Sequence, residues 1–270
     1  MSEQGLFGAG SVAEGYREFL EPVIFKPWAS RLLEFVDVQS GLAVLDVASG
    51  TGVVARAAAA RVGAGGRVIA SDISSEMLAM VNRGAETDGS AIETLECPAT
   101  ELAIPDQTVD RVVCQQGLPF IRDRPAAARE MRRVLRPEGR AAVSVWLSNP
   151  RVEPFIIYGE ALRAHGLPEP FPNAYDTSAT SMSVERVEAI LLEAGFADVV
   201  VRTEELALTW SSPDAAARGA MGTPYGPVLA RLDGSDRSQV LADIRDRMTA
   251  EDGHAVTHRT VTVLGRGTAP

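Results

Sequence analysis

Short apolar runs alternate with amphipathic segments through the first half of the chain. Each run has the length and apolar content of a buried strand. The segments between them repeat apolar residues at helical spacing and end at glycine or proline, which stop helices. This alternation predicts an α/β fold with a doubly wound, mostly parallel sheet and helices on both faces. The predicted strands are 42–48, 67–72, 92–98, 109–117 and 139–146.

The pattern differs on both sides of this region. Residues 12–37 are predicted to be helical, and the alternation fails after Trp146. Open α/β sheets bind ligands at the carboxyl ends of their strands, so the irregular segments should form a lid there. The expected organisation is an N-terminal helical cap at 1–37, a core at 38–147, a lid insertion at 148–182, a core helix and strand at 183–210, a helical lid insertion at 211–254, and a final strand and tail at 255–270.

A glycine turn follows the first strand, in the stretch AVLDVASGTGVVARAAA at 43–59. Gly50, Gly52 and Ala55 satisfy the pattern G-x-G-x-x-G/A, and Asp72 stands where a ribose-binding acid is expected. A purely structural turn, a dinucleotide site and an S-adenosylmethionine site are the three alternatives. Asp46 favours the third, because a carboxylate beside the turn repels a pyrophosphate and attracts a sulfonium or an ammonium group.

Three stretches carry a family resemblance. VLDVASGTG resembles the first signature of the class I S-adenosylmethionine-dependent methyltransferases, usually written D-x-G-x-G-x-G, with Ala48 in place of the first glycine. VIASDISSEMLAMV is similar to the second strand, ribose acid and helix of that family. Residues 100–146 resemble the small-molecule branch related to the ubiquinone and menaquinone C-methyltransferases, and YREFLEPVIFKPWASRLL is similar to the N-terminal cap of that branch. Residues 148–254 match little of it.

The resemblance implies a Rossmann-like fold with S-adenosylmethionine as cofactor and S-adenosylhomocysteine as product. Asp46 would face the cationic end of the cofactor, and Asp72 would accept the ribose hydroxyls, unless it caps the next helix instead. Pro98 replaces the acid that often binds adenine in the family, so backbone groups would serve there. Met77 is nearly as well explained by core packing. The expected cofactor-binding residues are Asp46, Ala48, Gly50, Gly52, Asp72, Ile73, Met77, Ala99, Thr100, Gln115 and Gln116.

Candidates for catalysis and for substrate binding come from the cap and the lid segments. Tyr16 could close the site, and His165 could act as a general base if the acceptor needs one. Packing is an equal alternative for Tyr16, and a surface position is the more ordinary explanation of His165. Phe120, Tyr175 and Tyr225 are expected to contact the substrate, although ordinary core packing also explains aromatic residues of this kind.

Composition and charge limit the classes of partner that we expect this chain to bind. The net charge is −10, and no basic cluster beyond an arginine-rich helix face is present, which argues against nucleic acid. Cys97 and Cys114 lack metal-ligand spacing, so no metal is expected. With no secretory signal and no run of about 18 apolar residues, we expect a cytoplasmic protein without a membrane segment. A homodimer is the default assembly.

The sequence therefore predicts transfer of a methyl group to an N, O or C atom of a small organic molecule. The Arg- and Ala-rich composition indicates a high-GC bacterium, where such enzymes often modify secondary metabolites, and such a metabolite is the expected substrate. The alternatives are a quinone-biosynthesis C-methyltransferase, a cofactor-binding protein without turnover and an NAD-dependent oxidoreductase.

Overall fold

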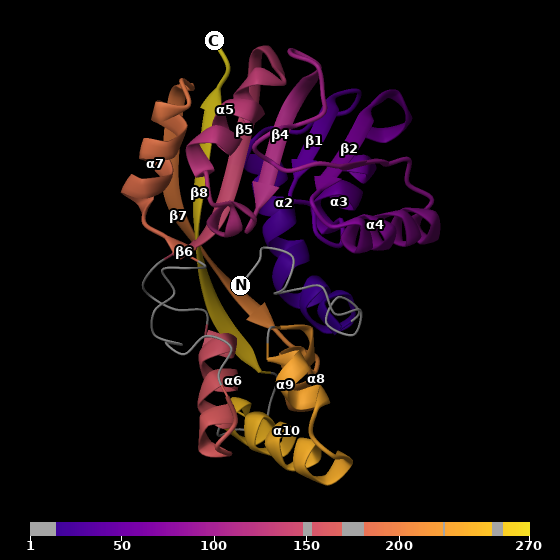
Figure 1. The fold of residues 1–270 in the computed structure, drawn as a ribbon, viewed down its shortest axis with the longest axis vertical. Helices are drawn as coiled ribbons and strands as arrows, with labels where there is room; N and C mark the ends of the chain where they lie inside the picture. The colour runs from indigo at the N-terminus through magenta and orange to yellow at the C-terminus, as the bar shows by residue number, and fades with distance from the viewer. Residues whose placement is uncertain (1–14, 148–152, 169–180, 224, 250–255) are drawn as a thin grey trace. The chain divides into compact units, whose positions relative to one another are not determined.

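The computed structural model describes residues 15–147, 153–168, 181–223, 225–249 and 256–270 (Figure 1). The chain divides into two compact units. We call the first the sheet unit, which comprises residues 26–147, 179–204 and 262–270. The second, the helical unit, comprises residues 1–25, 148–178 and 205–261.

The sheet has the order β3-β2-β1-β4-β5-β8-β7, with β6 also paired to β5. All pairings from β3 to β5 are parallel, and β8 is antiparallel to β5. This confirms the predicted doubly wound, mostly parallel sheet. The strands are β1 (Ala43–Val47), β2 (Arg67–Asp72), β3 (Glu93–Glu96), β4 (Val109–Gln115), β5 (Leu135–Leu147), β6 (Ser181–Met182), β7 (Ala197–Thr209) and β8 (Thr257–Thr268).

The chain leaves β1 toward β2 on one side and reaches β4 on the other, so the strand order reverses between β1 and β4. A crevice forms outside the carboxyl ends of the strands at such a reversal. The glycine turn follows β1 at this point. The sheet topology therefore places the predicted cofactor residues where a ligand site is expected.

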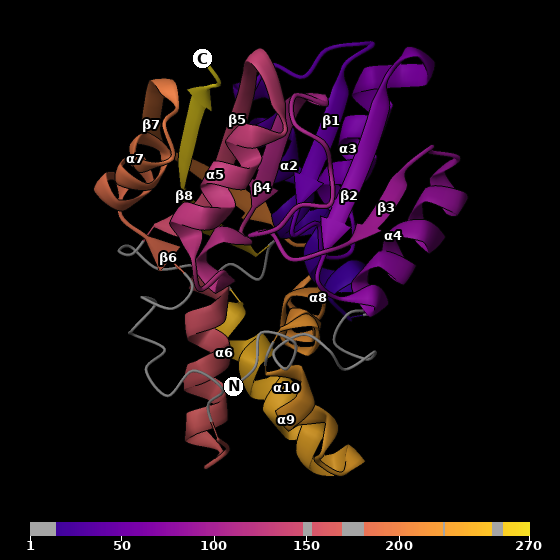
Figure 2. The same ribbon diagram turned by 45° about the horizontal axis from the view of Figure 1, so that its top comes forward.

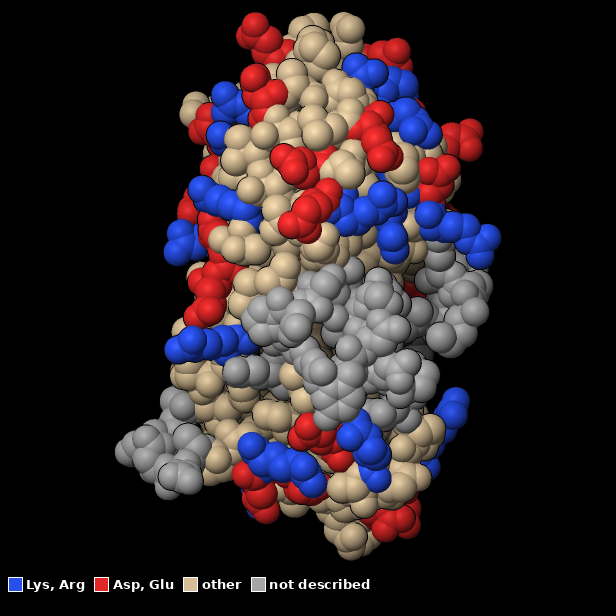
Figure 3. Space-filling model, turned by 90° about the vertical axis from the view of Figure 1, so that its left-hand side faces the viewer, with Lys and Arg blue, Asp and Glu red and all other residues tan. Residues whose placement is uncertain are grey.

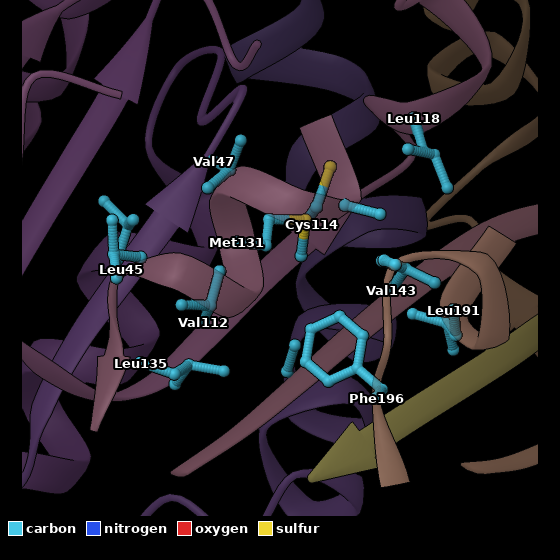
Figure 4. Packing of buried hydrophobic residues seen from close by; sticks show 14 of the residues in the cluster. Leu45, Val47, Val112, Cys114, Leu118, Met131, Leu135, Val143, Leu191 and Phe196 are labelled. Atoms are coloured by element: carbon cyan, nitrogen blue, oxygen red, sulfur yellow. The ribbon is translucent and has the colours of Figure 1, made fainter. Parts of the chain in front are cut away.

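Helices cover both faces of the sheet (Figures 1 and 2). On one face, α5 (Arg124–Arg133) and α7 (Val184–Glu193) contribute Met131 and Leu191 to the main apolar cluster. Figure 4 shows both side chains in this cluster together with Val112 and Val143 of the sheet. On the other face, α2 (Lys26–Phe35) contacts β4 and β5, and its Trp28 packs edge-on against Trp146, with ring centroids 6.4 Å apart. The remaining helices of this unit are α3 (Val53–Val62) and α4 (Ser75–Asp88).

The predicted cap at 1–37 is divided in the structure. A π-helical segment, Tyr16–Phe25, belongs to the helical unit, whereas α2 belongs to the sheet unit. The reason is the apolar face of α2, whose residues Trp28, Ala29, Leu32 and Leu33 are fully buried. The boundary therefore lies at residue 25, twelve residues before the predicted one.

The start of β5 also differs from the prediction. Helix α5 ends at Arg133, and β5 begins at Leu135 rather than at Gly139. Leu135 pairs with Val109, and the register then shifts before Arg140 pairs with Arg111. An irregularity of this kind accommodates Pro137, because proline cannot donate a hydrogen bond to a regular ladder.

The helical unit contains α6, α8, α9 and α10, and the ends of β7 and β8 nearest them. The hydroxyl of Tyr158 donates to the Ala216 carbonyl at 2.7 Å. Gly219 has no room for a side chain, since a Cβ there would lie 2.4 Å from the Tyr158 hydroxyl. These contacts connect α6 with α8. The bounds are α6 (Glu153–Ala164), α8 (Pro213–Arg218), α9 (Gly226–Ala230) and α10 (Gly234–Met248).

Charged side chains of both signs are interspersed on the face shown in Figure 3. The arginine-rich segment around α5 follows this pattern, because Arg133 pairs with Asp106 and Glu130, and Arg136 pairs with Asp110. No helix among the described residues has both the length and the hydrophobicity needed to cross a bilayer.

Candidate functional site

The turn between β1 and α3 is built from left-handed backbone. Ala48, Gly50 and Gly52 have φ angles of 54°, 54° and 83°. Gly52 caps α3 and donates its N–H to the Ser49 carbonyl at 2.9 Å. A left-handed alanine is uncommon, and Gly117 accommodates it, because a Cβ on Gly117 would lie 2.7 Å from the Ala48 Cβ. Ala48 stands where the usual signature has a glycine, and Gly117 after β4 leaves the space for the Ala48 side chain.

The two glycines of the turn meet different surroundings. A Cβ on Gly52 would lie 2.9 Å from Cγ2 of Val81, which is fully buried. A Cβ on Gly50 would meet no protein atom within 4 Å. Packing therefore requires glycine at position 52, whereas the backbone of Gly50 faces open space that a ligand could occupy.

Asp72 connects the end of β2 to this turn. Its Oδ2 accepts the Gly50 N–H at 2.9 Å, and its Oδ1 accepts the Ser74 N–H at 2.9 Å. The side chain that caps α4 is that of Ser74, whose Oγ accepts the Met77 N–H at 3.3 Å. Burial raises the pKa of Asp72, and the N–H groups of Ser74 and Gly50 oppose that rise. Each carboxylate oxygen keeps a further acceptor position for a ligand.

Asp46 lies near the carboxyl end of β1, directly before the glycine turn. Its side chain is buried, with 1% of the residue exposed, and its Oδ2 has no hydrogen-bond partner among the described residues. Burial raises the pKa of Asp46 to about 8, and the negative charge of Asp72 raises it further. The Ala55 N–H and the positive charge of Arg56 act in the opposite direction and lower this pKa. An unpaired buried oxygen is costly and marks a place where a cation or a donor from a ligand would be stabilised.

The expected adenine side lies next to Asp72. The Cys97 N–H donates to the Asp72 carbonyl at 3.1 Å, which brings the segment after β3 beside the end of β2. Ala99 and Thr100 are half-buried there, and Met77 is half-buried on the first turn of α4. Ile73 is 40% exposed, which is unusual for a large apolar residue. An apolar surface next to a carboxylate suits the face of an adenine ring and its ribose.

The segment after β4 closes the site on the other side of the turn. Gln115 ends β4, and Gln116 follows in the left-handed region with its N–H donating to the Ser144 carbonyl at 2.8 Å. Phe120 is half-buried in the short helical turn Leu118–Phe120. The structure thus brings all eleven predicted cofactor residues to the carboxyl ends of β1, β2, β3 and β4.

The predicted catalytic and lid residues are in the helical unit. Tyr16 stacks on Phe25, with ring centroids 4.5 Å apart. His165 follows α6 and is exposed, with its Nε2 3.4 Å from Oδ2 of Asp243. Each of these residues has a partner within its own unit, so their predicted catalytic roles stay predictions.

Two of the predicted substrate-binding residues, Tyr175 and Tyr225, belong to the predicted lid segments, and their roles also stay predictions. Tyr225 is buried, with 2% exposed, and its hydroxyl donates to the Phe155 carbonyl at 3.3 Å. Tyr175 lies outside the described residues. Among the residues that are described, no group of His, Cys, Asp and Glu is arranged to hold a metal ion.

Arg56 is absent from the predicted set and contacts the glycine turn directly. Its Nη1 donates to the Thr51 carbonyl at 2.6 Å. The available signal was one of two arginines among the alanines and valines of VVARAAAARV, the one nearer the turn. Sequence alone gives no way to tell such a cation from a solvated one.

Comparison with known proteins agrees with this geometry. Residues 44–139 match the family model described as a methyltransferase domain. The ubiquinone/menaquinone biosynthesis C-methyltransferase UbiE of Bordetella avium (strain 197N) is 39% identical over 137 residues, which cover 49% of this chain and 53% of the relative. The chain thus spans about half the length of the curated relatives it matches.

Solved structures share the fold. Phosphoethanolamine N-methyltransferase 2 of Haemonchus contortus, solved with S-adenosyl-L-methionine, matches with a TM-score of 0.57 at 18% identity, covering 90% of this chain and 52% of that one. The (4+2)-cyclase SpnF matches with a TM-score of 0.58 at 19% identity, covering 91% and 82%. Residues 44–139 therefore carry a methyltransferase domain, and by its signature residues this core is similar to the class I S-adenosylmethionine-dependent methyltransferases and to the UbiE enzymes.

Proposed function

We propose that this chain transfers a methyl group from S-adenosylmethionine to an N, O or C atom of a small organic molecule. The observation that supports this most directly is the unpaired oxygen of the buried Asp46, beside a turn whose Gly50 faces open space. A buried acid suits a ligand with cationic groups and does not suit a pyrophosphate. The match of residues 44–139 to a methyltransferase domain agrees with this proposal.

The residues present suit this cofactor. Asp46 would face the cationic end of the cofactor, and the backbone of the glycine turn would lie against it. Asp72 would accept hydrogen bonds from the ribose hydroxyls. Ile73 and Met77 would contact the adenine, with backbone groups of Ala99 and Thr100 in place of the missing acid. When bound, S-adenosylmethionine supplies an electrophilic methyl group on a sulfonium, whose departure as a neutral thioether needs no acid.

The chain's own contribution is then alignment of the acceptor and exclusion of water. A general base is needed only if the acceptor atom holds its proton tightly, as a phenol does at neutral pH. Tyr16 and His165 remain the candidates for that role, and Phe120, Tyr175 and Tyr225 the candidates for substrate contact. A secondary metabolite is the substrate class we propose.

A quinone-biosynthesis C-methyltransferase is the second candidate, because the UbiE relative of Bordetella avium is 39% identical over its matched half. A panel of amines, phenols and quinols tested with labelled S-adenosylmethionine separates the two candidates. Label in quinols alone would favour the second candidate, and label in amines or phenols the first.

The first test is a calorimetric titration of the wild-type protein with S-adenosylmethionine, S-adenosylhomocysteine and NADH. We expect micromolar binding of the two sulfur nucleosides and no binding of NADH. Binding of NADH alone, or of none of the three, would overturn the proposed function.

Replacing Asp72 with alanine should weaken S-adenosylhomocysteine binding by about 1–3 kcal/mol, the cost of losing an acceptor for a buried polar group. Because Asp72 also holds the N–H groups of Gly50 and Ser74, its loss could loosen the turn instead. A 2′-deoxy analogue separates the two effects. The wild type should bind the analogue more weakly than S-adenosylhomocysteine, and Asp72→Ala should bind both alike.

The matched control is Glu76→Ala, which removes an exposed acid from the first turn of α4. This variant should discriminate between S-adenosylhomocysteine and its 2′-deoxy analogue as the wild type does. If Asp72→Ala also keeps the full discrimination, Asp72 does not contact the ribose.

Replacing Gly50 with alanine should lower cofactor affinity at least tenfold, while costing only the strain of a left-handed alanine, about 1–2 kcal/mol of stability. Gly89→Ala is the matched control, because Gly89 is also left-handed, at φ 66°, with no atom within 4 Å of its Cβ position. Both variants should unfold at similar denaturant concentrations, and only Gly50→Ala should lose affinity in the titration. Equal affinity in the two variants would place the cofactor elsewhere.

A further inference from the structure

The side chain of Arg56 runs from the first turn of α3 back along the glycine turn. Only 9% of it is exposed. Its Nη1 donates to the Thr51 carbonyl at 2.6 Å, and its Nε lies 3.2 Å from Oδ2 of Asp88, the last residue of α4. A guanidinium withdrawn from water this far has to be compensated by such contacts. Arg56 therefore connects the turn, α3 and α4.

The neighbouring helix leaves space for this side chain. A Cβ on Gly84, inside α4, would lie 2.7 Å from Nη1 of Arg56 and 3.2 Å from its Cζ. Glycine weakens a helix interior relative to alanine, so a buried glycine there needs a packing reason. The guanidinium supplies that reason.

The contact with Thr51 acts on one peptide group of the turn. The carbonyl of the peptide between Thr51 and Gly52 accepts from Arg56, and its N–H donates to the Ser49 carbonyl at 2.9 Å. The peptide between Ser49 and Gly50 is held through the Gly50 N–H, which donates to Asp72. A turn with two glycines has much backbone freedom, and these bonds remove it.

We propose that Arg56 is a positioning residue, which holds the glycine turn in its cofactor-binding shape through the Thr51 carbonyl. This inference rests on the proposed function, since the shape matters because S-adenosylmethionine would lie against the turn. Arg56 itself need not touch the cofactor. A charged donor on a carbonyl forms one of the stronger hydrogen bonds in a protein, so its loss should be measurable.

The test compares Arg56→Met and Arg56→Lys with the wild type in S-adenosylhomocysteine titrations. Arg56→Met should raise the Kd about tenfold, as expected for losing one charge-assisted hydrogen bond. Arg56→Lys keeps a charged donor and should recover part of this loss. Arg83→Met is the matched control, because Arg83 is an exposed arginine of α4, and its Kd should stay within about twofold of the wild type.

Gly84→Ala tests the same contact without changing Arg56. Its Cβ should displace the guanidinium and raise the Kd in the same direction as Arg56→Met. This variant also serves if Arg56→Met does not fold.

Hydrogen exchange of the amides at 50–53 in the cofactor-free protein gives a second readout. Exchange there should speed up about tenfold in Arg56→Met and stay unchanged in Arg83→Met. An unchanged Kd and unchanged exchange in Arg56→Met, with normal binding by the wild type, would overturn the proposal. If the wild type binds no S-adenosylhomocysteine, the proposed function fails and the cofactor role of Arg56 with it, while the exchange rates still decide whether Arg56 holds the turn.

Discussion

Replacing Asp46 with asparagine should stabilise the protein at pH 8 and above and remove a decline in stability between about pH 4 and pH 8. Burial raises the Asp46 pKa in the folded state to about 8 from an ordinary value of 3.8. Between these two pH values the folded chain holds a proton that the unfolded chain has released, so the free energy of unfolding falls as pH rises. The difference corresponds to a loss of the order of 5 kcal/mol by pH 8. Asparagine carries no charge at any pH and avoids it.

The measurement is urea unfolding of the wild type and Asp46→Asn from pH 5 to pH 9, with the difference between the two curves isolating Asp46. Asp110→Asn is a control of opposite sign. Partial burial raises the pKa of Asp110, but the Ala43 N–H and the Arg136 guanidinium outweigh burial and hold that pKa below its usual value. Its stabilising contribution is present at neutral pH and is lost in acid. A flat difference curve for Asp46 would mean that its carboxyl ionises normally in the fold.

Under the proposed function, the same acid couples cofactor binding to a proton. The cationic groups of S-adenosylmethionine favour the charged form of Asp46, so binding at pH 7 should release a proton. Titrations in buffers with different ionisation enthalpies measure that release directly. Asp46→Asn should show none.

Replacing Gly52 with alanine should destabilise the protein by about 2–5 kcal/mol. A left-handed alanine costs about 1–2 kcal/mol, and forcing a methyl group against a packed side chain adds about 1–3 kcal/mol. The packed side chain is Val81, whose Cγ atoms would lie 2.9 Å and 3.0 Å from the new Cβ. Urea unfolding against Gly89→Ala isolates the clash, because Gly89→Ala carries the backbone strain alone.

A double-mutant cycle with Val81→Ala checks the cause. Truncating Val81 in the Gly52→Ala background should cost less than truncating it in the wild type, because it also relieves the clash. Additive costs in the two backgrounds would show that Val81 is not what excludes a side chain at position 52.

Contacts between residues far apart in the chain determine several features that the hydrophobic pattern did not predict or predicted at another position. Helix α2 joined the sheet unit because its buried face packs on β4 and β5, which lie more than seventy residues away. The chain also inserts β8 between β5 and β7, an order that local patterning does not encode. The burial of Arg56 against Gly84 and Asp88 depends on how α4 packs beside α3, so periodicity did not reveal it.

The sequence by itself determined the parallel core and the position of most residues of the candidate site. The strand, the turn with Gly50 and Gly52, and the acid at position 72 are local features, and parallel strands place their carboxyl ends at one edge whatever the details of packing. The tertiary structure determines the burial, the electrostatic surroundings and the free space around those residues. The raised pKa of Asp46, the lack of space at Gly52 and the open space at Gly50 all arise from surrounding atoms that the chain brings together only when it folds.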